Sequence, residues 1–370
     1  MKPRVYLAQV NFQYGSGVFL PYSIGLLAGY SITVPIIKTC YDFMPFIYRR
    51  DNIEILAAEM RDHPPAVLGF SCYVRNWEWN LALAREVKRR YPTCLVVLGG
   101  PHVPQHDPAF FQRHHYVDVL VHGEGEQAFA DVLIEALHPL PSYGDIPGVS
   151  AQGKRHMRVD GPARERISDL SVLPSPYLTG LFDLMVAVNP EIDWQGTLET
   201  NRGCPFMCSF CDWGSAIYAK VRAFDEGRLQ REVQWFGRKR IRFVYCADAN
   251  FGILKRDLSL AEYLTHVKAQ YDYPQQFRAT YAKNSDDKIF AIAQTLHAAD
   301  LNKGVTLSFQ SMDPHTLDVI KRKNIKIDHF ASLLHRYEAA GIATYTELIM
   351  GLPGETYASF KAGIDLLLDA

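Results

Sequence analysis

Three closely spaced cysteines, Cys204, Cys208 and Cys211, are the residues of this sequence that point most directly to chemistry. Thiolates spaced in this way along one loop can each bind one iron of a four-iron cubane, because iron–sulfur clusters are held by cysteine thiolates. The fourth iron would then have no protein ligand, and an open coordination position is what separates a catalytic metal site from a structural one. The motif therefore predicts an iron–sulfur site at which a chelating substrate can bind.

Two other interpretations of the cysteines compete with a cluster. A structural zinc site needs four ligands, usually in two closely spaced pairs, and the sequence offers no second pair. Buried, unreactive thiols are the alternative, and we interpret the other four cysteines in that way because they lie in or beside apolar segments: Cys40, Cys72, Cys94 and Cys246. The triplet differs from them, because its loop follows a strand-like segment and also carries Gly203, Pro205 and Phe210.

The segment from residue 191 to residue 370 must position this loop. Strand-like stretches alternate there with helix-like stretches after the cysteines. The predicted strands are 242–249, 277–283, 304–311 and 343–352, and the predicted helices are 225–237, 258–271, 286–299 and 330–341. With the strand before the cysteines this makes five successive units, which favours a (β/α) barrel entered from its first strand. The chain stops inside a helix at Ala370, so we expect the C-terminal part of the barrel domain to be missing.

The pattern Cys-x3-Cys-x2-Cys after a first barrel strand resembles the signature of the radical SAM superfamily. The resemblance implies a partial (β/α)6 barrel, truncated near its fifth unit. It also implies a [4Fe-4S] cluster whose open iron binds S-adenosylmethionine and whose electron cleaves it to a 5′-deoxyadenosyl radical. Contacts with these cofactors are implied for Phe210 and for residues at the ends of successive strands: Asp248, Asn250, Ser308, Gln310, Ser311, Gly351, Pro353 and Gly354. For each of these, ordinary turn chemistry is the alternative, since Gly, Pro, Ser and Asp favour turns.

The first half of the chain also alternates strands and helices, which predicts a Rossmann-like, doubly wound parallel sheet over residues 1–138. The expected strands are 4–10, 33–40, 66–73, 94–100 and 117–123, and the expected helices are 21–32, 77–90 and 124–137. Pro- and Gly-rich sequence then predicts a linker and small subdomain at 139–190. No Gly-x-Gly-x-x-Gly follows the first strand, which disfavours a nicotinamide or flavin cofactor.

The segments LGGPHVPQHDP and VDVLVHGEGEQAF resemble the cobalamin-binding domain that precedes the radical SAM barrel in one large subfamily. The resemblance implies cobalamin contacts from three strand-end loops: Ser71, Cys72, Tyr73, Gly99, Gly100, Pro101, His102, Gly123, Glu124 and Gly125. The alternatives are a scaffold whose glycines only permit tight turns, or a domain that keeps the fold and has lost the cofactor.

No Asp-x-His-x-x-Gly motif, which supplies a histidine to cobalt in many cobalamin proteins, occurs in the N-terminal domain. We therefore expect cobalamin to bind without a protein nitrogen on cobalt, with Arg75 and Trp77 covering its lower face. After the cluster motif, Asp212 and Trp213 are placed by position near the gap between cobalt and the adenosyl carbon, where the reaction would occur. Their context, Cys-Asp-Trp-Gly, resembles the cluster loop of methylases of carbapenem biosynthesis.

The bulk composition restricts the partners. The formal net charge is −1, with 39 basic and 40 acidic side chains, which gives no basic surplus for nucleic-acid binding. No window is apolar enough to span a membrane, and the N-terminus does not resemble a signal peptide. Seven cysteines, an odd number with three crowded together, favour a reducing compartment, and we expect a cytoplasmic protein.

The resemblance implies methyl transfer to an unactivated carbon of a small molecule, in natural-product and antibiotic biosynthesis. One S-adenosylmethionine would provide the methyl group through cobalamin and a second the radical, with electrons from a donor such as flavodoxin or ferredoxin. A radical rearrangement or cyclisation without methyl transfer is the alternative in the same subfamily. A non-catalytic iron–sulfur or cobalamin-binding protein is the third hypothesis, and it would not cleave S-adenosylmethionine.

Overall fold

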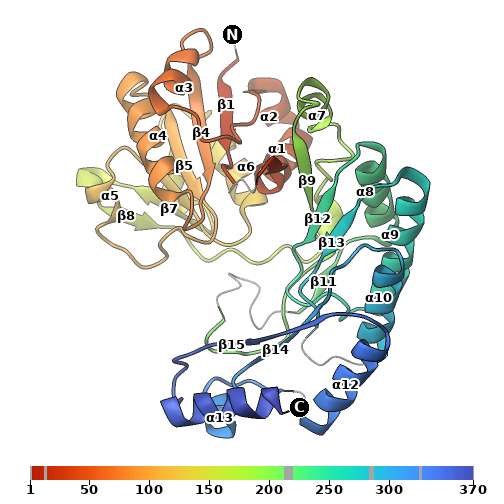
Figure 1. Ribbon diagram of the computed structural model, residues 1–370. Helices are drawn as coiled ribbons and strands as arrows, with labels where there is room; N and C mark the ends of the chain where they lie inside the picture. The colour runs from red at the N-terminus through yellow and green to blue at the C-terminus, as the bar shows by residue number, and fades with distance from the viewer. Residues whose placement is uncertain (1, 12–14, 212–219, 283–286, 325–326, 370) are drawn as a thin grey trace. The chain divides into compact units, whose positions relative to one another are not determined.

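The computed structural model describes the chain at residues 2–11, 15–211, 220–282, 287–324 and 327–369. Contacts between residues divide the chain into two compact units, Met1–Ile192 and Asp193–Ala370. Each unit combines helices with parallel strands, which confirms the α/β class expected from the alternating pattern (Figure 1). Among the described residues, no helix has both the length and the apolar character needed to cross a membrane.

The first unit is organised around one sheet, whose described strands lie in the order β3-β1-β4-β5-β6-β7-β8. The strands of this unit are β1 (Arg4–Ala8), β2 (Gly17–Phe19), β3 (Asp42–Phe43), β4 (Pro65–Ser71), β5 (Leu95–Gly99), β6 (Val119–Val121), β7 (Val149–Gln152) and β8 (Arg158–Asp160). The ladders from β3 to β6 are parallel, and β7 and β8 continue the sheet in antiparallel pairing. The carboxyl ends of β4, β5 and β6 therefore meet at one edge, where an open α/β sheet binds ligands.

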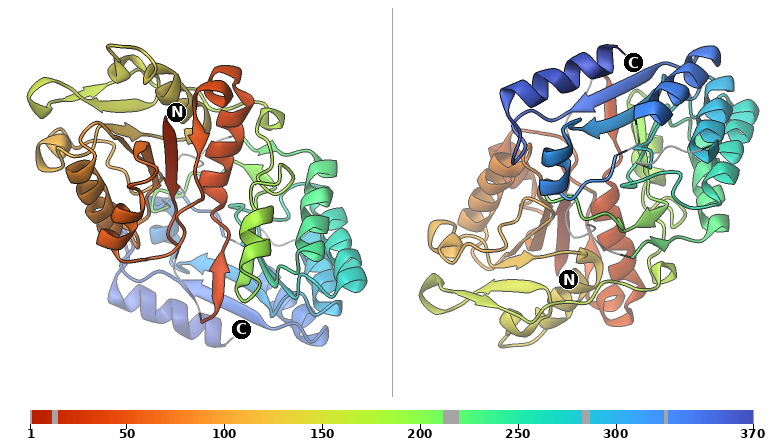
Figure 2. Two further views of the ribbon diagram at one scale, coloured as in Figure 1. Left: turned by 90° about the horizontal axis from the view of Figure 1, so that it is seen from above. Right: turned by 90° about the horizontal axis from the view of Figure 1, so that it is seen from below.

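Helices cover both faces of this sheet, as Figures 1 and 2 show. The helices of the unit are α1 (Tyr22–Thr33), α2 (Pro35–Cys40), α3 (Ile53–Glu59), α4 (Trp77–Arg90), α5 (Phe110–Arg113), α6 (Gly125–Glu135) and α7 (Asp183–Val188), with short 3-10 turns at Tyr143–Asp145, Lys154–His156 and Leu170–Val172. One apolar core lies between the sheet and α3, α4 and α5, and a second lies between the sheet and α1, α2 and α6. Alternate residues of β5 enter the two cores, so both sides of its continuous apolar run are buried.

Two parts of this unit differ from the sequence expectation or extend it. The prediction of a strand at residues 33–40 is wrong. This stretch contains the helix α2, which has Pro35 in its first turn and a fully buried Ile37. A short apolar run is ambiguous between the two structures, and proline at the first helical position needs no N–H partner. Within 139–190, expected to be a linker and small subdomain, β7 and β8 extend the first sheet.

The second unit has two parallel ladders in its described residues. Its strands are β9 (Asp193–Leu198), β10 (Asn201–Arg202), β11 (Arg222–Ala223), β12 (Phe243–Cys246), β13 (Gln276–Arg278), β14 (Val305–Gln310) and β15 (Thr344–Leu348). The first ladder joins β9, β12 and β13, and the second joins β14 and β15. The short strands β10 and β11 form a separate antiparallel pair on either side of the cysteine loop.

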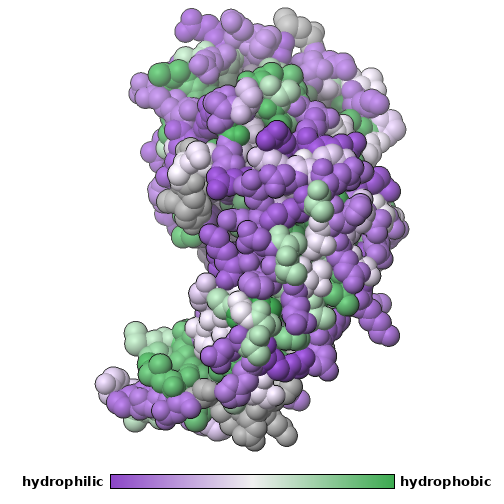
Figure 3. All heavy atoms as spheres, turned by 45° about the vertical axis from the view of Figure 1, so that its right-hand side comes forward, coloured by the Kyte–Doolittle hydropathy of each residue, from purple (hydrophilic) through white to green (hydrophobic). Residues whose placement is uncertain are grey.

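Helices alternate with these strands along the chain, in the order expected for β/α units. They are α8 (Glu226–Arg238), α9 (Asp257–Tyr271), α10 (Asp287–Ala298), α11 (Pro314–Val319), α12 (Ile327–Ala339) and α13 (Tyr357–Leu368). Figure 1 shows α8, α9 and α10 as a layer along one side of the first ladder. Apolar side chains gather in the lowest part of the face seen in Figure 3. Exposed apolar residues of the second unit include Met350 and Leu368.

Candidate functional site

The cysteine loop begins directly after β10 and is held at several points. Gly203 has a φ of 114°, a conformation that side chains other than glycine rarely adopt. Cys204 and Cys208 are buried and Cys211 is half-buried, with the Cys211 amide donating to the Cys208 carbonyl at 3.1 Å. The loop is therefore a folded turn that keeps two of the three sulfurs away from bulk water. Asp212 and Trp213, predicted to lie near the reacting atoms, fall outside the described residues.

Two side chains near these sulfurs, Asn250 and Arg322, carry hydrogen-bond donors. The Asn250 amide Nδ2 donates to Cys204 Sγ at 3.2 Å, and the Arg322 guanidinium lies near Cys208, whose side chain raises the pKa of Arg322 against the lowering effect of burial. A cluster-bound sulfur is a thiolate that can only accept, so these neighbours fit the ligand role. No three His, Cys, Asp or Glu side chains within the described ranges are arranged to hold a single metal ion. A cubane takes one thiolate on each of three irons, and the donor set of the loop fits that group.

Asp248, at the end of β12, lies 1% exposed next to the segment that leads to the cysteines. Its Oδ1 accepts from the amides of Thr200 at 2.8 Å and Asn201 at 3.2 Å. Its Oδ2 accepts from Asn201 Nδ2 at 2.7 Å and from the Thr200 hydroxyl. Burial raises the pKa of Asp248 to about 7 despite these hydrogen bonds. The carboxylate thus holds the 200–201 backbone, and the contact with S-adenosylmethionine implied for it stays a prediction.

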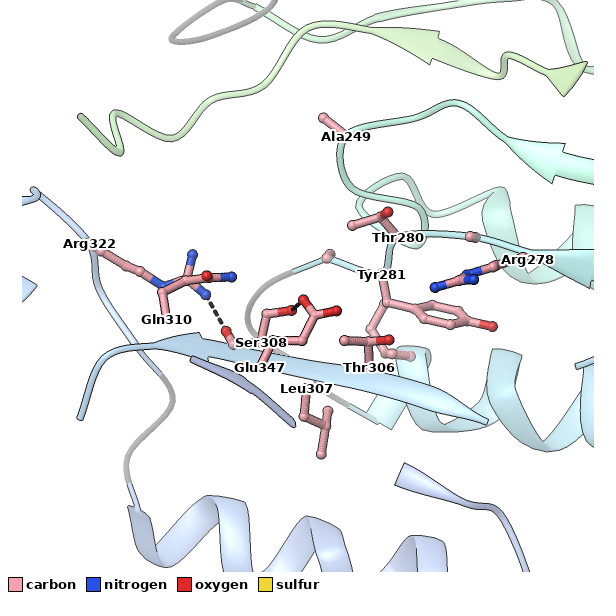
Figure 4. Close-up of a pocket in the computed structure, with 13 residues that line it drawn as sticks. Ala249, Arg278, Thr280, Tyr281, Thr306, Leu307, Ser308, Gln310, Arg322 and Glu347 are labelled. Carbon is pink, nitrogen blue, oxygen red and sulfur yellow. Dashed lines mark hydrogen bonds between the residues drawn. The ribbon is translucent and has the colours of Figure 1, made fainter. Parts of the chain in front are cut away.

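A cavity of about 130 Å³ lies within the second unit (Figure 4). Val305, Leu307 and Phe309 of β14 are buried on one side of the strand, and the alternate residues face the cavity. The polar residues of its lining are Arg278, Thr280, Tyr281, Thr306, Ser308, Gln310, Arg322 and Glu347. Ser308 Oγ donates to Glu347 Oε2 at 3.0 Å across the β14–β15 ladder. The cavity therefore carries both a carboxylate and guanidinium groups, which suits a polar or zwitterionic ligand.

The other predicted residues of the second unit lie outside this cavity lining. Ser311 is 1% exposed and donates to Glu355 Oε1 at 2.9 Å, and Glu355 Oε2 accepts from the Gly351 amide at 3.1 Å. Glu355 thus joins the end of β14 to the turn that contains Gly351, Pro353 and Gly354. Phe210 belongs to the cysteine loop and its function stays a prediction.

In the first unit, the predicted cobalamin residues lie on the loops that follow β4, β5 and β6. The Cys72 amide donates to the Gly99 carbonyl at 2.7 Å, and the Cys72 carbonyl accepts from the His102 amide at 3.2 Å. Gly100, with a φ of 108°, sits so close that an added Cβ would lie 2.7 Å from that carbonyl oxygen. A Cβ added at Gly123 would have no neighbouring heavy atom within 4 Å, so the space beside this residue is open. Close-packed loops beside open space fit a ligand that approaches the backbone.

Several residues next to these loops make contacts within the first unit. Trp77 packs edge-on against His102, with ring centroids 5.1 Å apart. The Glu124 carboxylate accepts from the Ile167 amide at 2.7 Å, which ties a later segment to the loop after β6. The carbonyl of Arg75 accepts a hydrogen bond from Arg50. The predicted cobalamin contacts of Ser71, Tyr73, Pro101 and Gly125 also remain predictions.

Asn76 is a central residue of this edge that the sequence analysis did not single out. It is 1% exposed, and its Nδ2 donates to the carbonyls of Val10 at 3.1 Å and Ser71 at 2.9 Å. Its Oδ1 accepts from the Tyr73 amide at 2.8 Å and from Asn80 Nδ2 at 3.2 Å. One amide therefore joins the segment after β1 to the end of β4 and the following turn. Only its position just before α4 could have drawn attention to it.

Models of two protein families match the chain, one in each of its two compact units. Residues 198–367 match the model described as the radical SAM superfamily, and residues 46–133 match the B12 binding domain. The chain contains a radical SAM domain and a B12 binding domain. The matches confirm the two resemblances drawn from the cysteine motif and from the strand-end loops.

Two curated relatives are similar to this chain over nearly its whole length. The chain is 46% identical over 354 residues to 2-(S-pantetheinyl)-carbapenam-3-carboxylate methyltransferase from Streptantibioticus cattleyicolor. It is also 46% identical over 354 residues to the cobalamin-dependent radical SAM methyltransferase TokK from Streptomyces tokunonensis. Each alignment covers 95% of this chain and 52% of the relative, so the chain spans about half the length of these proteins.

Solved structures show the same fold at much lower sequence identity. The radical S-adenosylmethionine methyltransferase TsrM from Kitasatospora setae superposes with a TM-score of 0.74 at 16% identity, covering 100% of this chain and 71% of TsrM. The cobalamin-dependent S-adenosylmethionine radical enzyme OxsB gives a TM-score of 0.73 at 17% identity, covering 99% of this chain and 52% of OxsB.

The radical SAM domain also contains site residues that the sequence analysis missed. Arg278, Glu347 and Arg322 line the cavity, yet none belongs to a motif recognised in the sequence. Arg278 and Glu347 lie at the ends of β13 and β15, but the strands predicted from the sequence, 277–283 and 343–352, continue past them, so strand-end position could not identify them. Arg322 follows α11 and had no such signal either.

Proposed function

We propose that this chain is the cofactor-binding part of a cobalamin-dependent radical SAM methyltransferase that acts on an unactivated carbon of a small molecule. The observation that carries the proposal is the cysteine loop, in which Cys204 and Cys208 are buried and Cys204 Sγ accepts a hydrogen bond from the Asn250 amide. The 46% identity to two methyltransferases supports methyl transfer over rearrangement. The bound groups would supply an electron, a methyl carrier and an adenosyl radical.

The residues of the chain would hold and align these groups. Cys204, Cys208 and Cys211 would bind the [4Fe-4S] cluster, and Asp248 would fix the backbone that leads to them. The loops after β4, β5 and β6 would hold cobalamin in the first unit, with Trp77 against its lower face. Cofactors carry the difficult chemistry in such enzymes, while the protein supplies orientation and excludes water.

We further propose that Arg278 binds a carboxylate of the substrate. Its guanidinium lies in the cavity lining, and such a group forms paired, charge-assisted hydrogen bonds with carboxylates. The name of one relative includes a carbapenam-3-carboxylate, which supports an anionic substrate of natural-product biosynthesis. Arg278→Gln should raise KM for a carboxylate substrate about tenfold to a hundredfold, the range expected for a lost charge-assisted hydrogen bond.

The test of this function is the mass of the product formed by the reduced, reconstituted protein from a 2-(S-pantetheinyl)-carbapenam-3-carboxylate. Methylation adds one CH2 unit to the substrate, whereas rearrangement leaves its mass unchanged and cyclisation by loss of hydrogen lowers it. A non-catalytic protein would leave S-adenosylmethionine intact. Lys303→Gln, an exposed change outside the cavity, is the charge control for Arg278→Gln and should leave KM unchanged.

The proposal also includes a redox partner and a compartment. The reaction needs single electrons at low potential, so we propose a donor such as flavodoxin or ferredoxin. The seven cysteines are free thiols in the structure, which supports a reducing location such as the cytoplasm. The nearly neutral net charge of the chain supports a small-molecule substrate, with neither nucleic acid nor a membrane as partner.

A further inference from the structure

Arg322 is a buried cation beside the cysteine loop. Its side chain lies in the segment after α11 with only 6% of the residue exposed. Its Nε donates to the Phe309 carbonyl at 3.0 Å and to Asn324 Oδ1 at 2.8 Å, and its Nη2 donates to the Ser308 carbonyl. These bonds fix the guanidinium at the end of β14, where it also lines the cavity (Figure 4).

The Arg322 guanidinium also lies near the cysteine loop. Burial lowers the pKa of Arg322, whereas the nearby side chains of Cys208 and Cys211 raise it, so the guanidinium lies close to both cysteines. The same segment contacts the loop through its backbone, because the Ser209 amide donates to the Ile320 carbonyl at 3.0 Å. An arginine keeps its positive charge throughout the accessible pH range. Two of the three sulfurs therefore lie beside a permanent, largely desolvated positive charge.

Asn250 provides a second and neutral donor on the third sulfur. It is 2% exposed, and its Nδ2 donates to Cys204 Sγ at 3.2 Å. Its Oδ1 is buried and accepts no hydrogen bond among the described residues. The amide is therefore held with its donor toward sulfur, since the reverse orientation would set an acceptor against a thiolate.

We propose that Arg322 and Asn250 are positioning residues that raise the reduction potential of the cluster, Arg322 through its charge and Asn250 through its N–H···S hydrogen bond. The inference rests on the cluster-binding role given above to the three cysteines. One-electron reduction adds a negative charge to the cluster and its thiolates, and both donors stabilise that charge. Hydrogen bonds to sulfur and local charge are established controls of cluster potential. The electron comes from the external one-electron donor.

The test is a redox titration of the reconstituted protein, monitored by electron paramagnetic resonance of the reduced cluster, for Arg322→Gln, Arg322→Lys and Asn250→Ala. At the midpoint potential of the parent protein, Arg322→Gln should lower the ratio of reduced to oxidised cluster about tenfold, a negative shift of about 59 mV. Arg322→Lys keeps the charge and should shift the potential less. Asn250→Ala should also shift it in the negative direction, by less than Arg322→Gln.

Lys321→Gln is the matched control, because it removes the same charge one residue away on an exposed side chain, and it should leave the potential unchanged. Full iron and sulfide content with an unchanged potential in Arg322→Gln would overturn the role of Arg322. If Arg322→Gln does not fold, Arg322→Met serves as the neutral variant, and full iron content with the parental potential in both Arg322→Met and Asn250→Ala would overturn the proposal. Failure of the parent protein itself to take up a cluster would instead refute the proposed function.

Discussion

Replacing Asp248 by asparagine should change how the stability of the protein depends on pH. The pKa of this carboxyl is raised from 3.8 to about 7, first of all by burial. A carboxyl whose pKa is higher in the folded state stabilises the fold when it is protonated, and this contribution is lost as pH rises through the folded-state pKa. Between 3.8 and about 7 the folded state holds about one more proton than the unfolded state, which corresponds to about 1.4 kcal/mol per pH unit.

The asparagine variant removes this titration and keeps most of the geometry. Its amide oxygen can still accept from the backbone amides of Thr200 and Asn201, but its NH2 group would face the Asn201 side-chain donor. One buried unsatisfied donor costs about 1–3 kcal/mol. At about pH 5 the parent protein should therefore be the more stable of the two. By about pH 7 its advantage should fall by about 3 kcal/mol, so that the two stabilities become similar or reverse.

The assay is urea unfolding of both proteins, before cofactor loading, at several pH values between about 5 and 8. Asp318→Asn, a change at an exposed carboxylate, is the control and should follow the parent protein at every pH. Parallel curves for the parent and Asp248→Asn proteins would refute the reasoning, because they would mean that Asp248 has the same charge state in the folded and unfolded chain throughout this range.

Three further predictions concern the two cofactor sites. Changing Cys204, Cys208 or Cys211 to alanine should abolish the cluster absorbance and bound iron, and a single variant with full iron content would remove that residue from the ligand set. Gly100→Ala should reduce cobalamin binding in an equilibrium assay, because its Cβ would lie 2.7 Å from a backbone oxygen of the neighbouring loop; unchanged affinity would mean that the loop is not part of the site. Asn76→Ala should lower the free energy of unfolding by about 2–4 kcal/mol through its lost hydrogen bonds, and a loss below about 0.5 kcal/mol in urea unfolding would contradict this structural role.

The cysteine site and the strand-end loops were predictable because their signals are local. Cys204, Cys208 and Cys211 lie on one turn, so their sequence spacing already limits their distances. Parallel strands bring their carboxyl ends to one edge, so a strand assignment places Ser308 and Gln310 near the cavity before any contact is known. Where the strand pattern is clear, both the fold class and part of the site follow from it.

Other parts of the site depend on contacts between distant segments, which no local pattern contains. Arg322 reaches the cysteine loop from a segment after α11, more than one hundred residues along the chain. The four hydrogen bonds of Asp248 to residues 200–201 likewise depend on how β12 packs beside β9. The stretch 33–40 was assigned to a strand because its apolar run is too short to show a helical period.

Methyl transfer is tested most directly by the ratio of the two products of S-adenosylmethionine in one anaerobic, reduced reaction with cobalamin and substrate. A methyl transfer that consumes one S-adenosylmethionine as methyl source and a second as radical source yields S-adenosylhomocysteine and 5′-deoxyadenosine. We expect equal amounts of both, each matching the amount of methylated product, and neither product in the Cys208→Ala protein. Formation of 5′-deoxyadenosine without S-adenosylhomocysteine or methylated product would contradict it.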